Sequence, residues 1–110
     1  MKPNTKNPAI LNLIDQFSKL YGCTWDDLLK KSRKDWLVEC RYLLMYFLHR
    51  KYLLSFALIA RLFDLDRTTV MHGISKIANQ ISSDVNFAEY IERMDSLLDI
   101  NFDVQVESVE

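Results

Sequence analysis

Polar and basic side chains are concentrated at one place in the chain, between residues 66 and 76. The set combines a carboxylate, two hydroxyl groups, an imidazole and two cations: Asp66, Arg67, Thr68, Thr69, His72 and Lys76. An arginine can donate two hydrogen bonds to guanine, an aspartate can accept one from the cytosine amino group, and threonine can contact a thymine methyl group or a phosphate. The histidine and the lysine are better placed for phosphates. These residue types predict contacts to the bases and backbone of duplex DNA.

Two short helices are predicted to position these side chains. Ser55 suits the N-cap of the first, which is apolar over residues 56–63, and residues 64–65 form the turn. Asp66 suits the N-cap of the second helix. Its buried face is apolar at helical spacing: Val70, Ile74, Ile77 and Ile81. Gly73, which costs about 1 kcal/mol relative to alanine inside a helix, permits close approach of another backbone. A buried helix followed by one with a polar, basic front is the layout of a helix-turn-helix.

The rest of the chain is predicted to be helical as well. It has only 2 Gly and 2 Pro, and both prolines lie in the first eight residues, so turns are few. Apolar spacing predicts further helices over about 8–21, 25–30, 35–51 and 84–99. The third of these is apolar around most of its circumference, which places it at the centre. Its aromatic residues are interpreted as core rather than as a platform for stacking bases: Tyr42, Tyr46 and Phe47. The expected fold is all-α, a compact bundle of about six helices.

Charge is distributed unevenly along the chain. Residues 1–76 carry 13 Lys/Arg against 7 Asp/Glu, a balance of +6, and residues 77–110 carry 1 against 8, a balance of −7. A basic body with an acidic end fits a nucleic-acid-binding protein, and the alternative is a solvated surface that is merely uneven. The most basic segment is KKSRKD, between two predicted helices, and its cations are placed to reach the DNA backbone or an adjacent minor groove: Lys31, Arg33 and Lys34.

The predicted domain organisation is a single helical DNA-binding domain over residues 1–99 and an acidic, flexible tail over residues 100–110. The tail sequence NFDVQVESVE alternates apolar and polar residues as a strand does, but it has no obvious partner strand. It is therefore interpreted as a loose tail, with addition to the sheet edge of another protein as the alternative. The acidic last helix and tail form the surface expected for any protein partner.

Several other classes of protein are disfavoured by the motifs. The chain has no phosphate-binding GxxxxGK[ST] loop and no HExxH, CxxC or GxSxG motif, so no enzyme, cofactor or metal site is predicted. His49 and His72 lie on different predicted helices. Cys23 and Cys40 are interpreted as buried thiols, which suits the cytoplasm. The chain has no signal peptide and no apolar run of 18 residues, so neither secretion nor membrane insertion is expected.

The segment DRTTVMHGISKI resembles the signature of the C-terminal DNA-binding domain of the bacterial replication initiator DnaA, which is roughly RDHTTVxHAxxKI. Two upstream segments, LYGCTWDDLLKKSRK and CRYLLMYFLHRKYLLSFALIARLF, are similar to the helix, basic loop, central helix and first recognition-unit helix of that family. The resemblance covers about residues 10–98. It implies a Trp-repressor-like helical fold that binds double-stranded DNA.

The resemblance also implies roles for individual residues. By position, three side chains meet bases in the major groove: Asp66, Arg67 and Thr68. Thr69 and the turn at Ser55 and Phe56 hold phosphates. Arg33, with Lys31 beside it, enters the neighbouring minor groove.

Two departures from the family pattern shape the functional expectation. The Gly-Gly-Arg that precedes the aspartate in the family is shortened to Asp64-Leu65, so Arg67 is expected to replace part of that arginine's role. The chain starts at Met1 without the family's ATPase module, so we expect a stand-alone, sequence-preferring DNA-binding domain that regulates replication or transcription. The alternative is a protein-interaction module of the same fold whose DNA binding is weak or masked by the acidic end.

Overall fold

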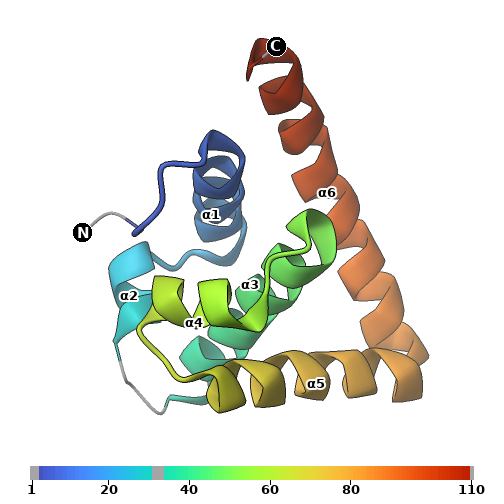
Figure 1. Cartoon of the computed structure of the whole chain (residues 1–110). Helices are drawn as coiled ribbons and strands as arrows, with labels where there is room; N and C mark the ends of the chain where they lie inside the picture. Colours follow the sequence, from blue (N-terminus) through green and yellow to red (C-terminus); the bar gives the residue numbers. More distant parts are fainter. Residues whose placement is uncertain (1–2, 31–33, 110) are drawn as a thin grey trace.

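The computed structural model describes the backbone of residues 3–30 and 34–109, and the side chains of these residues up to Leu98. Within these ranges the chain forms six α-helices and no strand, which confirms the all-α prediction (Figure 1). The helices are α1 (Pro8–Tyr21), α2 (Trp25–Leu29), α3 (Asp35–Tyr52), α4 (Phe56–Phe63), α5 (Arg67–Ser83) and α6 (Val85–Val109).

Most of the helices begin where a side chain accepts a hydrogen bond from a free backbone N–H group, whereas α3 follows Lys34 without such a cap. Ser55 accepts from the N–H of Leu58 at 3.1 Å, and Asp84 accepts from that of Phe87 at 3.1 Å. α1 ends at Gly22, whose φ of 67° is left-handed and favours glycine. These local signals explain why the predicted boundaries of α1 and α4, and the predicted start of α5, agree closely with the structure.

α3 lies at the centre of the molecule and packs against α1, α2, α4 and α5 (Figure 1). Its inner face is fully buried and includes Leu44, Met45, Phe47 and Leu48. Of the aromatic residues predicted to be core, Phe47 is buried, whereas Tyr42 and Tyr46 are half-buried against the core. The central position predicted for this helix is confirmed.

The environment of Gly73 differs from the prediction. Gly73 is buried on α5, but the group that approaches it is the aromatic ring of Tyr42 on α3, not a backbone. The prediction was wrong because helix sequence alone does not show which side chain of a crossing helix faces a glycine.

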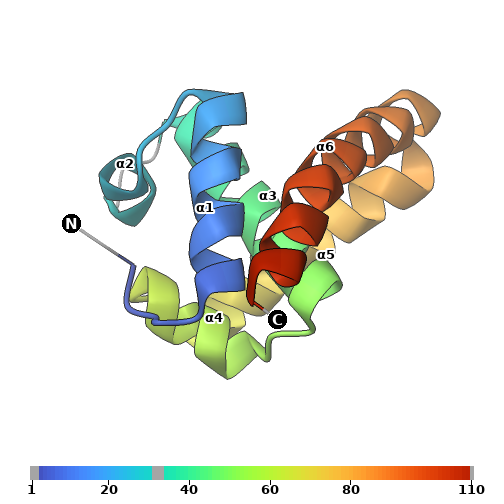
Figure 2. The same ribbon diagram turned by 90° about the horizontal axis from the view of Figure 1, so that it is seen from above.

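α6 continues further than predicted. It runs to Val109, beyond the predicted end at Asp99, because no glycine or proline interrupts the sequence after Asp84. The strand-like alternation of residues 101–110 is therefore not expressed as a strand in the described backbone; the tail's flexibility stays a prediction. α6 packs against α1 (Figure 2), contacts α5, and buries Ile91 and Leu98.

Two polar contacts also attach α6 to the rest of the bundle. The hydroxyl groups of Tyr90 and Tyr21 are 2.8 Å apart. Lys51, whose side chain is only 7% exposed, donates to the Asp95 carboxylate at 2.9 Å. Among the described helices, none combines the length with the apolar character that a membrane-spanning segment needs.

Leu53 provides a test of local strain in this fold. It ends α3 in the left-handed conformation (φ 55°) with 84% of its surface exposed. A leucine in this conformation costs about 1–2 kcal/mol, so Leu53→Gly should raise the free energy of unfolding by about 1 kcal/mol. Chemical denaturation measures the gain. Leu53→Ala is the matched control because it keeps the strain, and a glycine variant no more stable than the alanine variant would rule out the strain.

Candidate nucleic-acid interface

α4 and α5 form the predicted helix-turn-helix. The turn is closed by Asp64, which adopts the left-handed conformation (φ 56°) and donates its N–H to the carbonyl groups of Ala60 and Arg61. Leu65 donates to the carbonyl of Ala60 at 2.9 Å. Asp64 therefore takes the conformation for which glycine is usually required, and Asp is one of the few other residues that tolerates it.

The inner faces of α4 and α5 hold the two helices against the core. α4 buries four residues: Ile59, Ala60, Leu62 and Phe63. The ring centroids of Phe63 and of Trp25 on α2 are 5.0 Å apart. α5 buries Val70, Ile74 and Ile77, three of the four residues predicted, and Ile81 is half-buried. The opposite face of α5 is consequently free to meet a ligand.

The outer face of α5 carries most of the side chains that the sequence predicted for DNA binding. Arg67, Thr68, His72 and Lys76 are exposed, and Thr69 is half-buried. The first two lie in the first turn of the helix, where backbone N–H groups lack helical partners and the helix dipole is positive. The arrangement places hydrogen-bond donors at the end of α5 that favours anions.

Asp66 has a structural role in addition to the predicted base contact. Its carboxylate accepts the N–H of Thr69 at 2.7 Å, which caps α5. The hydrogen bond from Thr69 holds the pKa of this exposed carboxyl below its ordinary value. Asp66 is thereby kept ionised and oriented at the front of the helix.

Because the pKa of Asp66 is depressed in the folded state, its stabilising effect is present at neutral pH and is lost as pH falls below about 4. Asp66→Asn retains a good capping side chain that does not titrate. We expect the difference in melting temperature between this variant and the wild type to be constant from about pH 5 to 8 and to shift in favour of the variant at lower pH. Circular dichroism melts measure it; a pH-independent difference would contradict the role of the charged cap.

The start of α4 offers backbone rather than side-chain groups. Ser55 is exposed, and its hydroxyl oxygen already accepts the cap hydrogen bond. Phe56 is half-buried, and its ring stacks on that of His49 with centroids 4.8 Å apart. His49 Nδ1 is 2.9 Å from the Leu54 carbonyl oxygen. His49 therefore contacts the turn before α4 on both sides, at Leu54 and at Phe56. Its sequence position did not predict this role.

Of the three cations of the basic segment that were predicted to reach DNA, only Lys34 falls in the described part of the chain. Lys31 and Arg33 lie outside the described residues. Lys34 is exposed and directly precedes α3. The next residue, Asp35, lines a cleft together with Lys76, so the beginning of α3 lies against the middle of α5.

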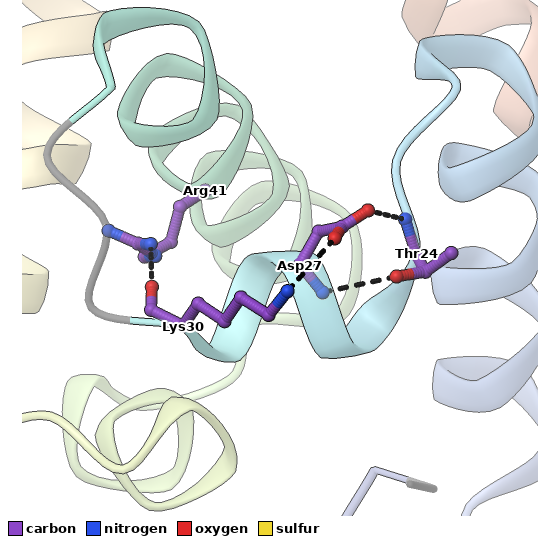
Figure 3. A network of polar contacts seen from close by, with 4 residues as sticks. All are labelled: Thr24, Asp27, Lys30 and Arg41. Atoms are coloured by element: carbon purple, nitrogen blue, oxygen red, sulfur yellow. Dashed lines mark hydrogen bonds and ion pairs between the residues drawn. The ribbon is translucent and has the colours of Figure 1, made fainter.

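A buried arginine holds the backbone at the end of α2, where the basic segment begins. Arg41 is 9% exposed, and its guanidinium donates to the carbonyl of Leu28 at 2.8 Å. It also donates to the carbonyl of Lys30, as Figure 3 shows. Burial lowers the pKa of this guanidinium. At the other end of α2, Thr24 and Asp27 exchange cap hydrogen bonds of 3.1 and 3.0 Å. Both ends of this short helix are therefore held by side chains.

No group of three or more His, Cys, Asp or Glu side chains in the described residues is arranged to hold a metal ion. Cys23 and Cys40 are free and buried, as predicted, and burial raises the pKa of the Cys23 thiol to about 11. This thiol is protonated at neutral pH and correspondingly unreactive.

Comparison with known proteins agrees with this arrangement. Residues 10–77 match the family model for the bacterial DnaA protein helix-turn-helix. The chain is 27% identical over 79 residues to the chromosomal replication initiator protein DnaA of Mycoplasma genitalium and 28% identical over 79 residues to that of Mycoplasma pneumoniae. Each alignment covers 72% of this chain and 18% of the relative. The chain thus spans about a fifth of the length of these curated relatives.

Proposed function

Because the chain belongs to the bacterial DnaA helix-turn-helix family, we propose that it binds double-stranded DNA with the start of α5 in the major groove. The observation that carries the proposal is the contrast between the two faces of α5. Val70, Ile74 and Ile77 are buried, whereas the first turn exposes Arg67 and Thr68. A helix anchored in this way can present its N-terminal residues to base edges as a rigid unit.

Sequence preference is proposed to come from three residues at the front of α5. Arg67 donates to guanine O6 and N7, Asp66 accepts from a cytosine amino group, and Thr68 contacts a base edge or a thymine methyl group. The cap hydrogen bond from the Thr69 N–H goes to Oδ1 of Asp66, and Oδ2 is the oxygen atom proposed to accept from the base. The cap would therefore orient the carboxylate that reads the base.

Affinity is proposed to come from phosphate contacts around this front. Thr69, His72 and Lys76 on α5 flank one part of the groove, and the N-terminus of α4 at Ser55 and Phe56 supplies backbone N–H groups. The basic segment is proposed to reach the backbone or the adjacent minor groove: Lys31, Arg33 and Lys34. Such contacts release counterions, so affinity should fall steeply with salt.

A role in regulating replication or transcription is proposed from the family and from the relatives named as replication initiators.

Selection of bound duplexes from a random pool, followed by sequencing, tests sequence preference. Enrichment of a common motif supports the proposal, and recovery of unrelated sequences with equal affinity would contradict it.

Masking of the DNA-binding face by the acidic end remains the alternative, and the packing of α6 determines how to test it. Ile91 and Leu98 of α6 are buried, so removing all of α6 would expose the core residues that pack against them. The informative deletion therefore removes only residues 100–110. α6 begins after the C-terminal end of α5. At a rise of about 1.5 Å per residue, this end of α5 lies about 24 Å along the helix from Arg67. We expect the deletion to change DNA affinity little; a large gain would support masking by the acidic tail.

A further inference from the structure

Tyr42 on α3 packs directly onto the backbone of α5. A Cβ atom placed on Gly73 would lie 2.5 Å from Cδ1 and 2.8 Å from Cε1 of the Tyr42 ring. Real Cβ atoms do not approach other carbon atoms so closely, so any other residue at position 73 would displace the ring. The glycine is therefore required by the ring and not by the α5 backbone, which is helical at this point.

The same ring contacts two polar side chains on the outer face of α5. The His72 ring meets it edge-on, with centroids 6.2 Å apart and planes at 83°. The Lys76 ammonium lies 6.0 Å from the Tyr42 ring centroid. Because His72 and Lys76 are four residues apart, they lie on the same side of the helix. One ring, for which Gly73 leaves room, thus lies close to both side chains.

The cleft beside Lys76 contains a competing set of partners. It is lined by Asp35 and Glu39 of α3 as well as by Tyr42 and Lys76. Pairing with a carboxylate would neutralise the ammonium and compete directly with a phosphate. The face of an aromatic ring attracts a cation through its quadrupole and leaves the net charge unchanged. Contact with the Tyr42 ring therefore leaves the positive charge of Lys76 available to a phosphate.

We infer that Tyr42 and Gly73 form a matched pair that positions Lys76 and His72 for phosphate contact. Tyr42 is then a positioning residue, and this inference rests on the proposed DNA binding.

Fluorescence-anisotropy titration of a labelled duplex at several salt concentrations tests the pair. Tyr42→Phe keeps the ring face and should bind as the wild type does. Tyr42→Leu should weaken binding about five- to tenfold near 0.1 M salt and reduce the slope of log affinity against log salt by about 1, as loss of one phosphate contact requires. Adding Lys76→Ala to Tyr42→Leu should cause little further loss, and adding Glu39→Gln should restore part of the affinity.

Gly73→Ala provides a second route to the same state, because its Cβ displaces the ring while Tyr42 is retained. It should reproduce the loss of salt slope seen with Tyr42→Leu. Tyr46→Leu is the matched control, since Tyr46 is a half-buried tyrosine on the same helix that lines a different cleft, with α6. Its affinity should stay within about twofold of the wild type. Thermal melts show whether each variant is folded.

Two outcomes would overturn the inference while leaving the proposed function intact. One is a folded Tyr42→Leu variant and a folded Gly73→Ala variant that both bind with wild-type affinity and slope. The other is a loss that adds fully to that of Lys76→Ala, which would show that Tyr42 acts independently of the lysine. Failure of the wild type to bind any duplex would instead contradict the proposed function itself.

Discussion

Replacing Arg41 with methionine is expected to lower the free energy of unfolding by about 2–4 kcal/mol. The guanidinium is 9% exposed and donates to the carbonyl groups of Leu28 and Lys30 at the end of α2. Methionine fills a similar volume but donates no hydrogen bond. Both carbonyl groups would therefore lose a charged donor at a largely buried site. Urea denaturation followed by circular dichroism measures the change.

Two controls separate the hydrogen bonds from other effects of the substitution. Arg41→Lys keeps the charge but lacks the planar fork that reaches both carbonyl groups, so an intermediate loss is expected. Arg93→Met makes the same change at an exposed position on α6 and should stay within about 0.5 kcal/mol of the wild type. An Arg41→Met variant as stable as the wild type would show that the cost of burying the guanidinium offsets its hydrogen bonds.

Replacing Arg67 with alanine is expected to cost about 1–3 kcal/mol on the preferred duplex, a loss of roughly five- to 150-fold in affinity. The reason is that Arg67 is exposed in the first turn of α5 and is proposed to donate two hydrogen bonds to guanine. The loss should be smaller on unrelated duplexes, so specificity should fall together with affinity. Competition binding with the selected site and with single-base variants of it measures both quantities.

Lys76→Ala is the informative comparison for Arg67→Ala, because a phosphate contact carries no sequence information. It should weaken binding to all duplexes about equally and reduce the salt dependence. If Arg67→Ala behaved in this way too, Arg67 would be a phosphate contact, and the shortened turn at Asp64 and Leu65 would have lost its arginine contact to bases without replacement.

Much of the fold was predictable because its signals are local. Ser55, Asp66 and Asp84 precede apolar helical segments, and each accepts the cap hydrogen bond that its position predicts. The apolar spacing of α5 identified its buried face, and the remaining polar residues identified the outer face. The same local reasoning placed the helix-turn-helix correctly.

Contacts between distant parts of the chain were not predictable in this way. The ion pair of Lys51 with Asp95 joins residues far apart in sequence, and the burial of Arg41 depends on where the end of α2 meets α3. Tyr42 was interpreted only as core, and its contact with Gly73 depends on how α3 and α5 cross. The mid-helix glycine was a visible signal of close approach, but nothing in the sequence named the approaching ring.

Titration of labelled duplex DNA with the full chain at low salt, followed by fluorescence anisotropy, tests the central claim most directly. We predict saturable binding whose affinity falls steeply as salt is raised, and which weakens when the outer face of α5 is altered by Arg67→Ala or Lys76→Ala but not by Arg93→Ala on α6. Absence of binding to any duplex at low salt, or binding that is indifferent to both α5 substitutions, would contradict DNA recognition by α5.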